Sequence, residues 1–246
     1  MEAPFWRHLD AGDGVHVAFT RVEAGNLSLS AGVTDADDPA HARRAALASR
    51  RRLEATMGVP QGGLRFLHQT HSADVVDAAA ASGPQPPIGD AWLSTDASAA
   101  LAIMVADCLP VMFVGRVGER PMTAGAHAGR VGLLGGVLEN TVAAMRTAGA
   151  QEISAWIGPG ACGRCYEVPE SLRAESSEGR PALASETRWG TPALDLRAEA
   201  AAVLASREVT VTDVAGCTIE DEDLFSHRRA PGRGRFAGLV WRNGHD

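Results

Sequence analysis

The sequence LAIMVADCLPVMFV, residues 101–114, is followed closely by MTAGAHAGRVGLLGGV, residues 122–137. Both stretches contain apolar runs of strand length that end in polar residues, which are Asp107 and Cys108 in the first stretch and His127 in the second. The second stretch continues to about residue 148 with apolar side chains at helical spacing. Short strands that alternate with helices predict a mixed α/β fold.

The same alternation extends along the whole chain. We expect strands at residues 16–21, 64–67, 74–78, 99–106, 111–114, 122–126, 153–157, 209–214 and 236–241. We expect helices at residues 39–57, from Arg130 to about residue 148, and at 196–206, and an exposed helix or loop at 175–192. Because neither a repeat nor a convincing linker divides the sequence, residues 1–246 are predicted to form a single domain.

The composition excludes several classes of function. Of the 246 residues, 45% are hydrophobic, which is enough to bury a sizeable core. Basic residues number 23 against 30 acidic ones, and a net charge of -7 argues against nucleic acid or an anionic membrane as the main partner. The sequence contains no lysine, which excludes Schiff-base and lysine-base mechanisms.

The expected compartment is the cytoplasm, where thiols stay reduced. The N-terminus lacks a basic region followed by an apolar run, and no stretch of about 18 apolar residues occurs in the chain. Cysteines of such a protein are more often metal ligands or catalysts than disulfides. We expect a monomer or a weak homodimer.

Three polar clusters lie where predicted strands end. His68 and His71 follow the strand at 64–67, Cys108 follows the strand at 99–106, and His127 follows the strand at 122–126. Strand ends of α/β folds commonly converge on one crevice, and two imidazoles with one thiolate are good ligands for zinc or copper. The alternative is that the histidines are structural and that Cys108 is a small buried hydrophobic residue.

The other cysteines form the motif Cys162-x-x-Cys165, with Cys217 later in the chain. A zinc knuckle needs a second pair, and a redox motif of this type normally opens a helix, whereas Tyr166 and a proline follow here. We interpret the motif as structural or incidental.

Two regions offer anion-binding groups. Arg50 belongs to a run of arginines at residues 50–52 on a predicted helix, and three successive residues cannot all face one direction. Residues 129–132 precede another helix and offer free backbone N–H groups for phosphate, although this segment is also compatible with an ordinary helix start.

Five motifs together resemble the YfiH/YlmD-like family, also called the laccase-domain or multicopper polyphenol oxidase family. The resemblance covers residues 26–241, nearly the whole chain. The motifs are HQTHSADVV (68–76), VADCLPVMFV (105–114), AGAHAGRVGLLGGV (124–137), IGPGACGRCYEV (157–168) and SHRRAPGRGRFAGLVW (226–241).

The resemblance implies a layered α/β/β/α sandwich with mixed sheets. It implies metal ligation by His71, Cys108 and His127, because the family's ligands match these positions. Family members are described as zinc-binding enzymes that phosphorolyse adenosine, inosine, guanosine and methylthioadenosine and deaminate adenosine. An older description of the family is that of a copper-dependent polyphenol oxidase.

The sequence departs from the family pattern in two motifs. The family's Gln-Val-His-Gly reads Gln-Thr-His-Ser around His71, and its Ala-Gly-Trp-Arg-Gly reads Ala-Gly-Arg-Val-Gly at residues 128–132. The family arginine therefore aligns with Val131, and Arg130 replaces the tryptophan. If that arginine binds phosphate or substrate, this chain uses Arg130 or Arg50, which matches an arginine of the family's first helix.

These observations lead to a set of functional hypotheses. The first is a zinc-dependent purine nucleoside enzyme in which Asp107, or alternatively His68, transfers protons. A purely orienting role for Asp107 is the alternative. A copper-dependent oxidase would require more histidines than the eight present. A thiol hydrolase, with Cys108 as nucleophile and His127 as base, and a non-catalytic metal-binding relative are the remaining hypotheses.

Overall fold

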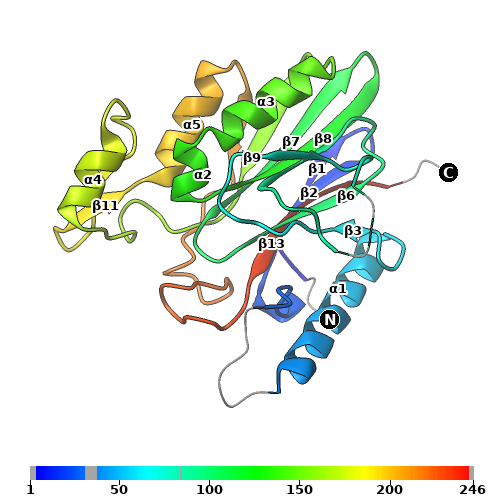
Figure 1. Cartoon of the computed structure of the whole chain (residues 1–246), viewed down its shortest axis with the longest axis horizontal. Coiled ribbons are helices and arrows are strands. Elements are labelled where there is room, and N and C mark those ends of the chain that lie inside the picture. The colour runs from blue at the N-terminus through cyan, green and yellow to red at the C-terminus, as the bar shows by residue number, and fades with distance from the viewer. Residues whose placement is uncertain (1–3, 31–37, 82, 84, 244–246) are drawn as a thin grey trace.

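The computed structural model describes residues 4–30, 38–81, 83 and 85–243. Within these residues the chain forms two mixed sheets flanked by helices (Figure 1). The first sheet has the strand order β1 (Phe5–Gly12), β2 (Val15–Thr20), β13 (Phe236–Arg242), β6 (Ala100–Val105) and β3 (Leu64–Arg65). The second has the order β12 (Thr210–Asp213), β9 (Ile153–Ile157), β7 (Leu109–Val117), β8 (Arg120–Ala128), β5 (Ala91–Ser94) and β4 (Val75–Asp77).

The two sheets pack face to face, as the alternation of buried residues along β6 shows. Leu101 and Ile103 point into the core between the sheets, where they join Phe19, Trp92 and Met112. The intervening alanines of β6 belong to a separate core on the outer face of the first sheet. This period of two is what a strand buried on both faces requires.

Helix α1 (Pro39–Met57) covers the outer face of the first sheet, on the opposite side of the molecule from α3 (Val137–Thr147) and α5 (Leu196–Ser206) (Figure 1). Its first turn is capped by Asp38, whose side chain accepts a hydrogen bond of 2.9 Å from the N–H of Ala40. Gly58 ends the helix in the left-handed conformation, with φ of 70°. The predicted helix at 39–57 is confirmed in both bounds.

The outer face of the second sheet is covered by α3 (Val137–Thr147) and α5 (Leu196–Ser206). The order of helices and sheets is therefore α/β/β/α, which confirms the predicted layered fold. The single helix expected from Arg130 to residue 148 is wrong, because α2 (Arg130–Leu134) and α3 are separate helices. The break lies at Gly135 and Gly136, and Gly136 has a φ of 92°, which interrupts the helix.

Several short or partly exposed elements were not predicted from the spacing of apolar residues in the sequence. Strand β1 at the sheet edge has half-exposed side chains, and β5 is only four residues long. The segment 175–192 contains the end of α4 (Glu170–Ser177) and the hairpin of β10 (Ala184–Glu186) with β11 (Pro192–Leu194). In the described part of the chain no helix has the length and apolarity needed to cross a membrane.

Candidate functional site

The three candidate ligands lie together at one end of the second sheet. Cys108 directly precedes β7, and His127 is next to last in β8, opposite Pro110 of β7. His71 lies in the loop between β3 and β4. The distance from His71 Nε2 to Cys108 Sγ is 3.9 Å, and the rings of His71 and His127 have centroids 4.7 Å apart. One potential ligand atom from each of the three residues lies within 4.8 Å of the others.

Asp90, which lies in none of the sequence motifs, organises two of these residues. Its side chain is fully buried and accepts hydrogen bonds from the backbone N–H groups of Thr70, His71 and Ser72, at 3.0, 3.0 and 2.7 Å. Three successive N–H groups around one carboxylate form a concave anion site, which holds His71 at its φ of 62°. Burial alone would raise the pKa of Asp90, but hydrogen bonds from His127, Thr70 and Ser72 hold it well below its usual range.

The same carboxylate fixes the orientation of His127. Nδ1 of His127 lies 2.7 Å from Oδ1 of Asp90. Burial lowers the pKa of His127, although its bond to Asp90 acts in the opposite direction. A neutral imidazole that donates from Nδ1 keeps the lone pair of Nε2 available for a metal ion.

Gly129 provides the space that the cluster needs. A Cβ atom at this position would lie 2.9 Å from Cys108 Sγ and 2.9 Å from Cδ2 of His71, which is closer than side chains pack. The cluster fits a zinc site with three protein ligands, because it holds two imidazoles and one thiol. Asp90 supports one of the imidazoles, and Gly129 leaves room where the thiol and the ring of His71 meet.

Asp107 lies beside the cluster in a strained conformation. Its φ is 95°, which is uncommon for a residue with a side chain and is concentrated at functional sites. The carboxylate accepts hydrogen bonds from Thr218 Oγ1 at 2.6 Å and from the N–H of Arg228 at 2.8 Å. These two bonds tie the turn before β7 to the segment that precedes β13.

Two cavities adjoin the cluster. The larger, of about 300 Å³, is lined by His71, Cys108 and Asp107 together with Tyr166, His227 and the three arginines Arg130, Arg228 and Arg235. The smaller, of about 170 Å³, is lined by His71 and His127 together with His68 and Arg235. Sequence reasoning missed Arg228, Arg235 and Tyr166, although the motif at 226–241 contains both arginines.

The arginines of the larger cavity differ in how they are held. Arg228 lies over the ring of Tyr166, 4.8 Å from its centroid, and donates to the carbonyl of Glu167. The guanidinium groups of Arg130 and Arg235 have no hydrogen-bond or ion-pair partner within the residues that the structure describes. Val131, aligned with the family arginine, is 53% exposed on the surface, and Arg130 lines the cavity.

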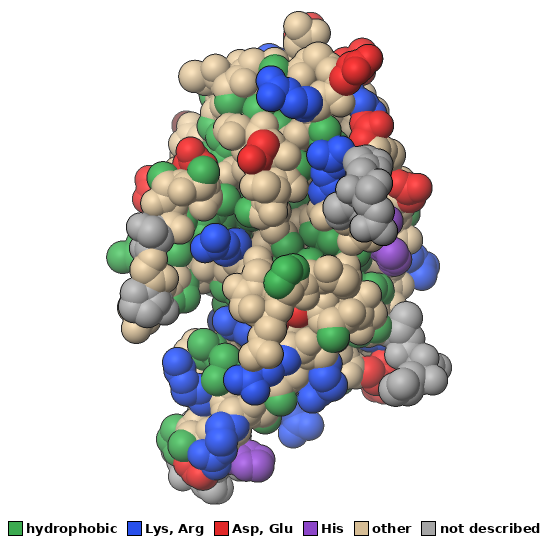
Figure 2. Space-filling view, turned by 90° about the vertical axis from the view of Figure 1, so that its right-hand side faces the viewer, with side chains coloured by type: hydrophobic (Ala, Val, Ile, Leu, Met, Phe, Trp, Pro, Cys, Tyr) green, Lys and Arg blue, Asp and Glu red, His purple; other side chains and the backbone are tan. Residues whose placement is uncertain are grey.

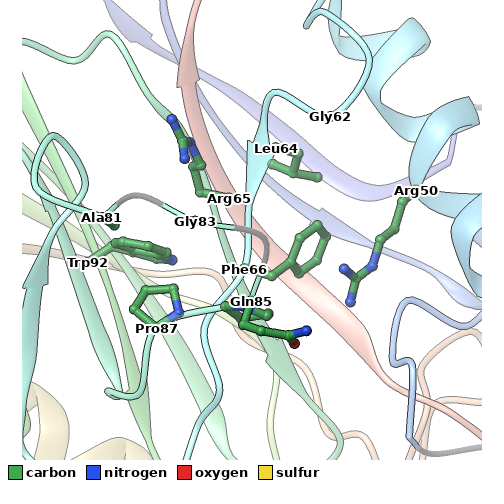
Figure 3. Close-up of a pocket in the computed structure, with 11 residues that line it drawn as sticks. Arg50, Gly62, Leu64, Arg65, Phe66, Ala81, Gly83, Gln85, Pro87 and Trp92 are labelled. Carbon is green, nitrogen blue, oxygen red and sulfur yellow. The ribbon is translucent and has the colours of Figure 1, made fainter.

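Arg50 lies in a different pocket, of about 200 Å³, shown in Figure 3. Its guanidinium is 3.6 Å from the centroid of the Phe66 ring, and its Nε donates to the carbonyl of Leu27. Burial lowers the pKa of Arg50 to about 10. Arg50 is not among the residues that line either cavity of the cluster; it contacts Met104, which lines the smaller one.

The neighbours of Arg50 in the run at residues 50–52 are exposed. Figure 2 shows basic side chains gathered over the lower part of the molecule, where α1 lies. The expectation that the three successive arginines cannot share one direction is confirmed.

Comparison with known proteins agrees with this architecture. A purine nucleoside phosphorylase of Streptomyces coelicolor is 40% identical over 243 residues, which cover 94% of this chain and 97% of the relative. One of Mycobacterium tuberculosis is 36% identical, with coverage of 96% and 97%. The crystal structure of a Neisseria meningitidis protein is 32% identical with a TM-score of 0.80, covering 98% of this chain and all of that one.

The YlmD protein of Geobacillus stearothermophilus is 26% identical with a TM-score of 0.75, over 98% of this chain and 99% of that one. A family model described as "Multi-copper polyphenol oxidoreductase laccase" matches residues 16–243. The chain therefore belongs to this laccase-domain family, the YfiH/YlmD-like family that its motifs resemble.

Proposed function

We propose that the protein is a zinc-dependent purine nucleoside enzyme. It would phosphorolyse adenosine, inosine, guanosine and methylthioadenosine, and deaminate adenosine. The observation that carries this proposal is one cavity of about 300 Å³ in which His71 and Cys108 share the wall with Arg130, Arg228 and Arg235. The names of the relatives, purine nucleoside phosphorylase, support the same reading.

His71, Cys108 and His127 are the residues that would hold zinc. When bound with three protein ligands, zinc supplies Lewis acidity at an open fourth position. Asp90 keeps the proton of His127 on Nδ1, so that Nε2 retains a lone pair for the metal ion. Gly129 keeps the approach to Cys108 and His71 free of side-chain atoms.

In phosphorolysis an oxygen of inorganic phosphate bonds to C1′ of the ribose while the bond from C1′ to the purine breaks. The purine leaves with the electron pair and takes up a proton. The guanidinium groups of Arg130 and Arg235 are the proposed phosphate ligands, because guanidinium matches phosphate geometry and neither group has a partner within the described residues. Arg228, which lies on the ring of Tyr166, adds positive charge to the same wall.

In deamination water adds at C6 of adenine and ammonia leaves. Asp107 is the proposed proton-transfer group, with His68 of the smaller cavity as the alternative. Each carboxylate oxygen of Asp107 accepts one hydrogen bond and keeps a second lone pair for a substrate proton. An asparagine retains both bonds, because its amide can donate to Thr218 Oγ1 and accept from Arg228. Asp107→Asn is expected to lower kcat by about 10² to 10⁴ without loss of zinc.

The proposal is tested by incubating the purified zinc-loaded protein with adenosine, with and without phosphate. Adenine and ribose 1-phosphate should form only with phosphate, and inosine should form without it. Turnover no greater than that of Cys108→Ala would refute the proposal.

Phosphate binding is tested separately at Arg130 and at its neighbour Val131, which aligns with the family arginine. Arg130→Met is expected to raise the KM for phosphate at least tenfold with a smaller change in the KM for adenosine. Val131→Ala, on the exposed neighbouring side chain, is the matched control and should leave both constants unchanged. Equal effects on the two KM values would contradict the role of Arg130.

The alternative hypotheses make different predictions. A thiol hydrolase needs a thiolate, but burial raises the pKa of the Cys108 thiol to about 11. A raised pKa favours the neutral thiol, which weighs against metal-free nucleophilic catalysis. Oxygen uptake with phenols that follows added copper would support the oxidase, and bound metal without any turnover would support a non-catalytic role.

A further inference from the structure

A second group of potential ligands lies outside the candidate site. It consists of Cys162, Cys165, Cys217 and Glu220, and one ligand atom from each lies within 4.8 Å of the others. The sequence offers no second cysteine pair, but the fold brings Cys217-x-x-Glu220 against Cys162-x-x-Cys165. We propose that these four residues bind a structural zinc ion in tetrahedral S₃O coordination.

The backbone forms the two turns that such a site requires. The N–H of Cys165 donates to the carbonyl of Cys162 at 2.9 Å, and the N–H of Glu220 donates to the carbonyl of Cys217 at 3.1 Å. Each turn therefore carries its two donors at the spacing found in zinc knuckles. A β-bridge between Gly160 and Cys217 holds the turns side by side.

The three thiols of the group are available as metal ligands. All three are free cysteines, and Cys165 is only 4% exposed. Zinc would replace the thiol protons, which leave to solvent, and thiolate ligands select zinc over magnesium or calcium.

A zinc ion would reduce the negative charge of the group. Three thiolates and one carboxylate carry four negative charges, which zinc reduces to two. Arg188 forms an ion pair with Glu220 and compensates one more. This pair orients the carboxylate from outside, as supporting residues of metal sites do.

The position of the group explains what a metal ion would contribute. Tyr166, next to Cys165, lines the large cavity, and Thr218, next to Cys217, donates to Asp107 at 2.6 Å. A zinc ion would therefore fasten the segment that contributes Tyr166 to the cavity wall to the segment whose Thr218 holds Asp107 of the same wall. The ion would act on the shape of that wall and would not touch a substrate.

Metal analysis of the purified, reduced, chelator-free protein tests the proposal. Wild type should contain two zinc ions per chain, and Cys108→Ala, which removes the other site, should contain one. Cys108→Ala loaded with cobalt should still show thiolate-to-cobalt charge transfer and tetrahedral ligand-field bands. Because Cys108 is absent from that variant, these bands would come from the Cys162 group.

Variants of the group itself separate ligation from folding. Glu220→Gln alters a surface residue and should release zinc to a chelator at least tenfold faster than Glu222→Gln, an exposed control with the same change of charge. Glu220→His should restore slow release, because imidazole is a zinc ligand. Cys217→Ser should lose one zinc, and if it fails to fold, the comparison of the glutamate variants still decides the question.

Three results would overturn the proposal. One is a cobalt spectrum of Cys108→Ala without charge-transfer bands. A second is full reactivity of all three thiols in native Cys108→Ala. A third is a mass lower by two hydrogens under non-reducing conditions, which would show a disulfide within the group instead of a metal ion.

Discussion

The substitution Asp90→Asn tests whether one buried carboxylate controls the metal affinity of the candidate site. An asparagine must place its NH₂ group where one carboxylate oxygen lies. At the Oδ2 position the NH₂ would meet two backbone donors, from Thr70 and Ser72. At the Oδ1 position it would meet one backbone donor, from His71, and the ring of His127.

The second arrangement costs less, because His127 can move its proton to Nε2 and accept a hydrogen bond at Nδ1. The partly buried N–H of His71 then lacks this acceptor, and an unsatisfied donor shielded from water costs about 1–3 kcal/mol. More importantly, protonated Nε2 of His127 offers no lone pair to a metal ion. Zinc affinity at this site is therefore expected to fall about 10- to 100-fold, the range typical of lost supporting contacts.

The measurement is competition between metal-free protein and a chromophoric zinc chelator, alongside urea unfolding of the same sample. Asp77→Asn is the control, because exposed Asp77 accepts one backbone hydrogen bond, from Ala79, at 2.8 Å. A folded Asp90→Asn protein that binds zinc as tightly as wild type would refute this reasoning. An unfolding free energy equal to that of wild type would refute the expected cost of the unpaired His71 N–H.

Three further predictions concern packing and metal binding. Gly129→Ala should weaken zinc binding at least tenfold in chelator competition, because its Cβ would contact Cys108 Sγ and the ring of His71 at 2.9 Å; unchanged affinity would contradict the close approach. Gly158→Ala should lower the free energy of unfolding by about 1–3 kcal/mol in urea titrations, because its Cβ would overlap the buried Phe19 ring. Zinc at 100 times the dissociation constant of the Cys108 site should stabilise the protein by about 2.7 kcal/mol in thermal unfolding, and Cys108→Ala should abolish that increment.

The sequence predicted best the elements whose buried residues follow one period. Helix 39–57 and strand 153–157 have the expected bounds, because Asp38 and Gly58 cap the helix and every second residue of the strand is buried. Strand β1 lacks such a signal, since its pairing at the sheet edge leaves both faces partly exposed. The break between α2 and α3 depends on Gly136 adopting a positive φ, which the spacing of apolar residues cannot predict.

The sequence predicted the three candidate metal ligands, but it did not predict the residues that hold them in place or line the cavity beside them. His71, Cys108 and His127 follow predicted strands, and the structure brings them together, although His127 lies inside β8 and not after it. Asp90 binds backbone N–H groups of the loop at residues 70–72, and Arg235 lines the large cavity only once the chain has folded. Neither feature produces a periodic pattern of residues in the sequence. Arg50 stands in a pocket of its own, because stacking on Phe66 directs its guanidinium there.

The hairpin of β7 and β8 is paired from its turn to its open end, where Leu109 lies opposite Ala128 and Pro110 opposite His127. Cys108 and His127 therefore stand at the open end of this hairpin, where Leu109 and Ala128 are fully buried. They meet only after the last pairs have closed, and only in this register, since a slip of one residue would turn His127 to the other face of the sheet. A metal ion held by both would join the two strands at this end, and zinc occupancy should slow backbone hydrogen exchange there more than beside the turn.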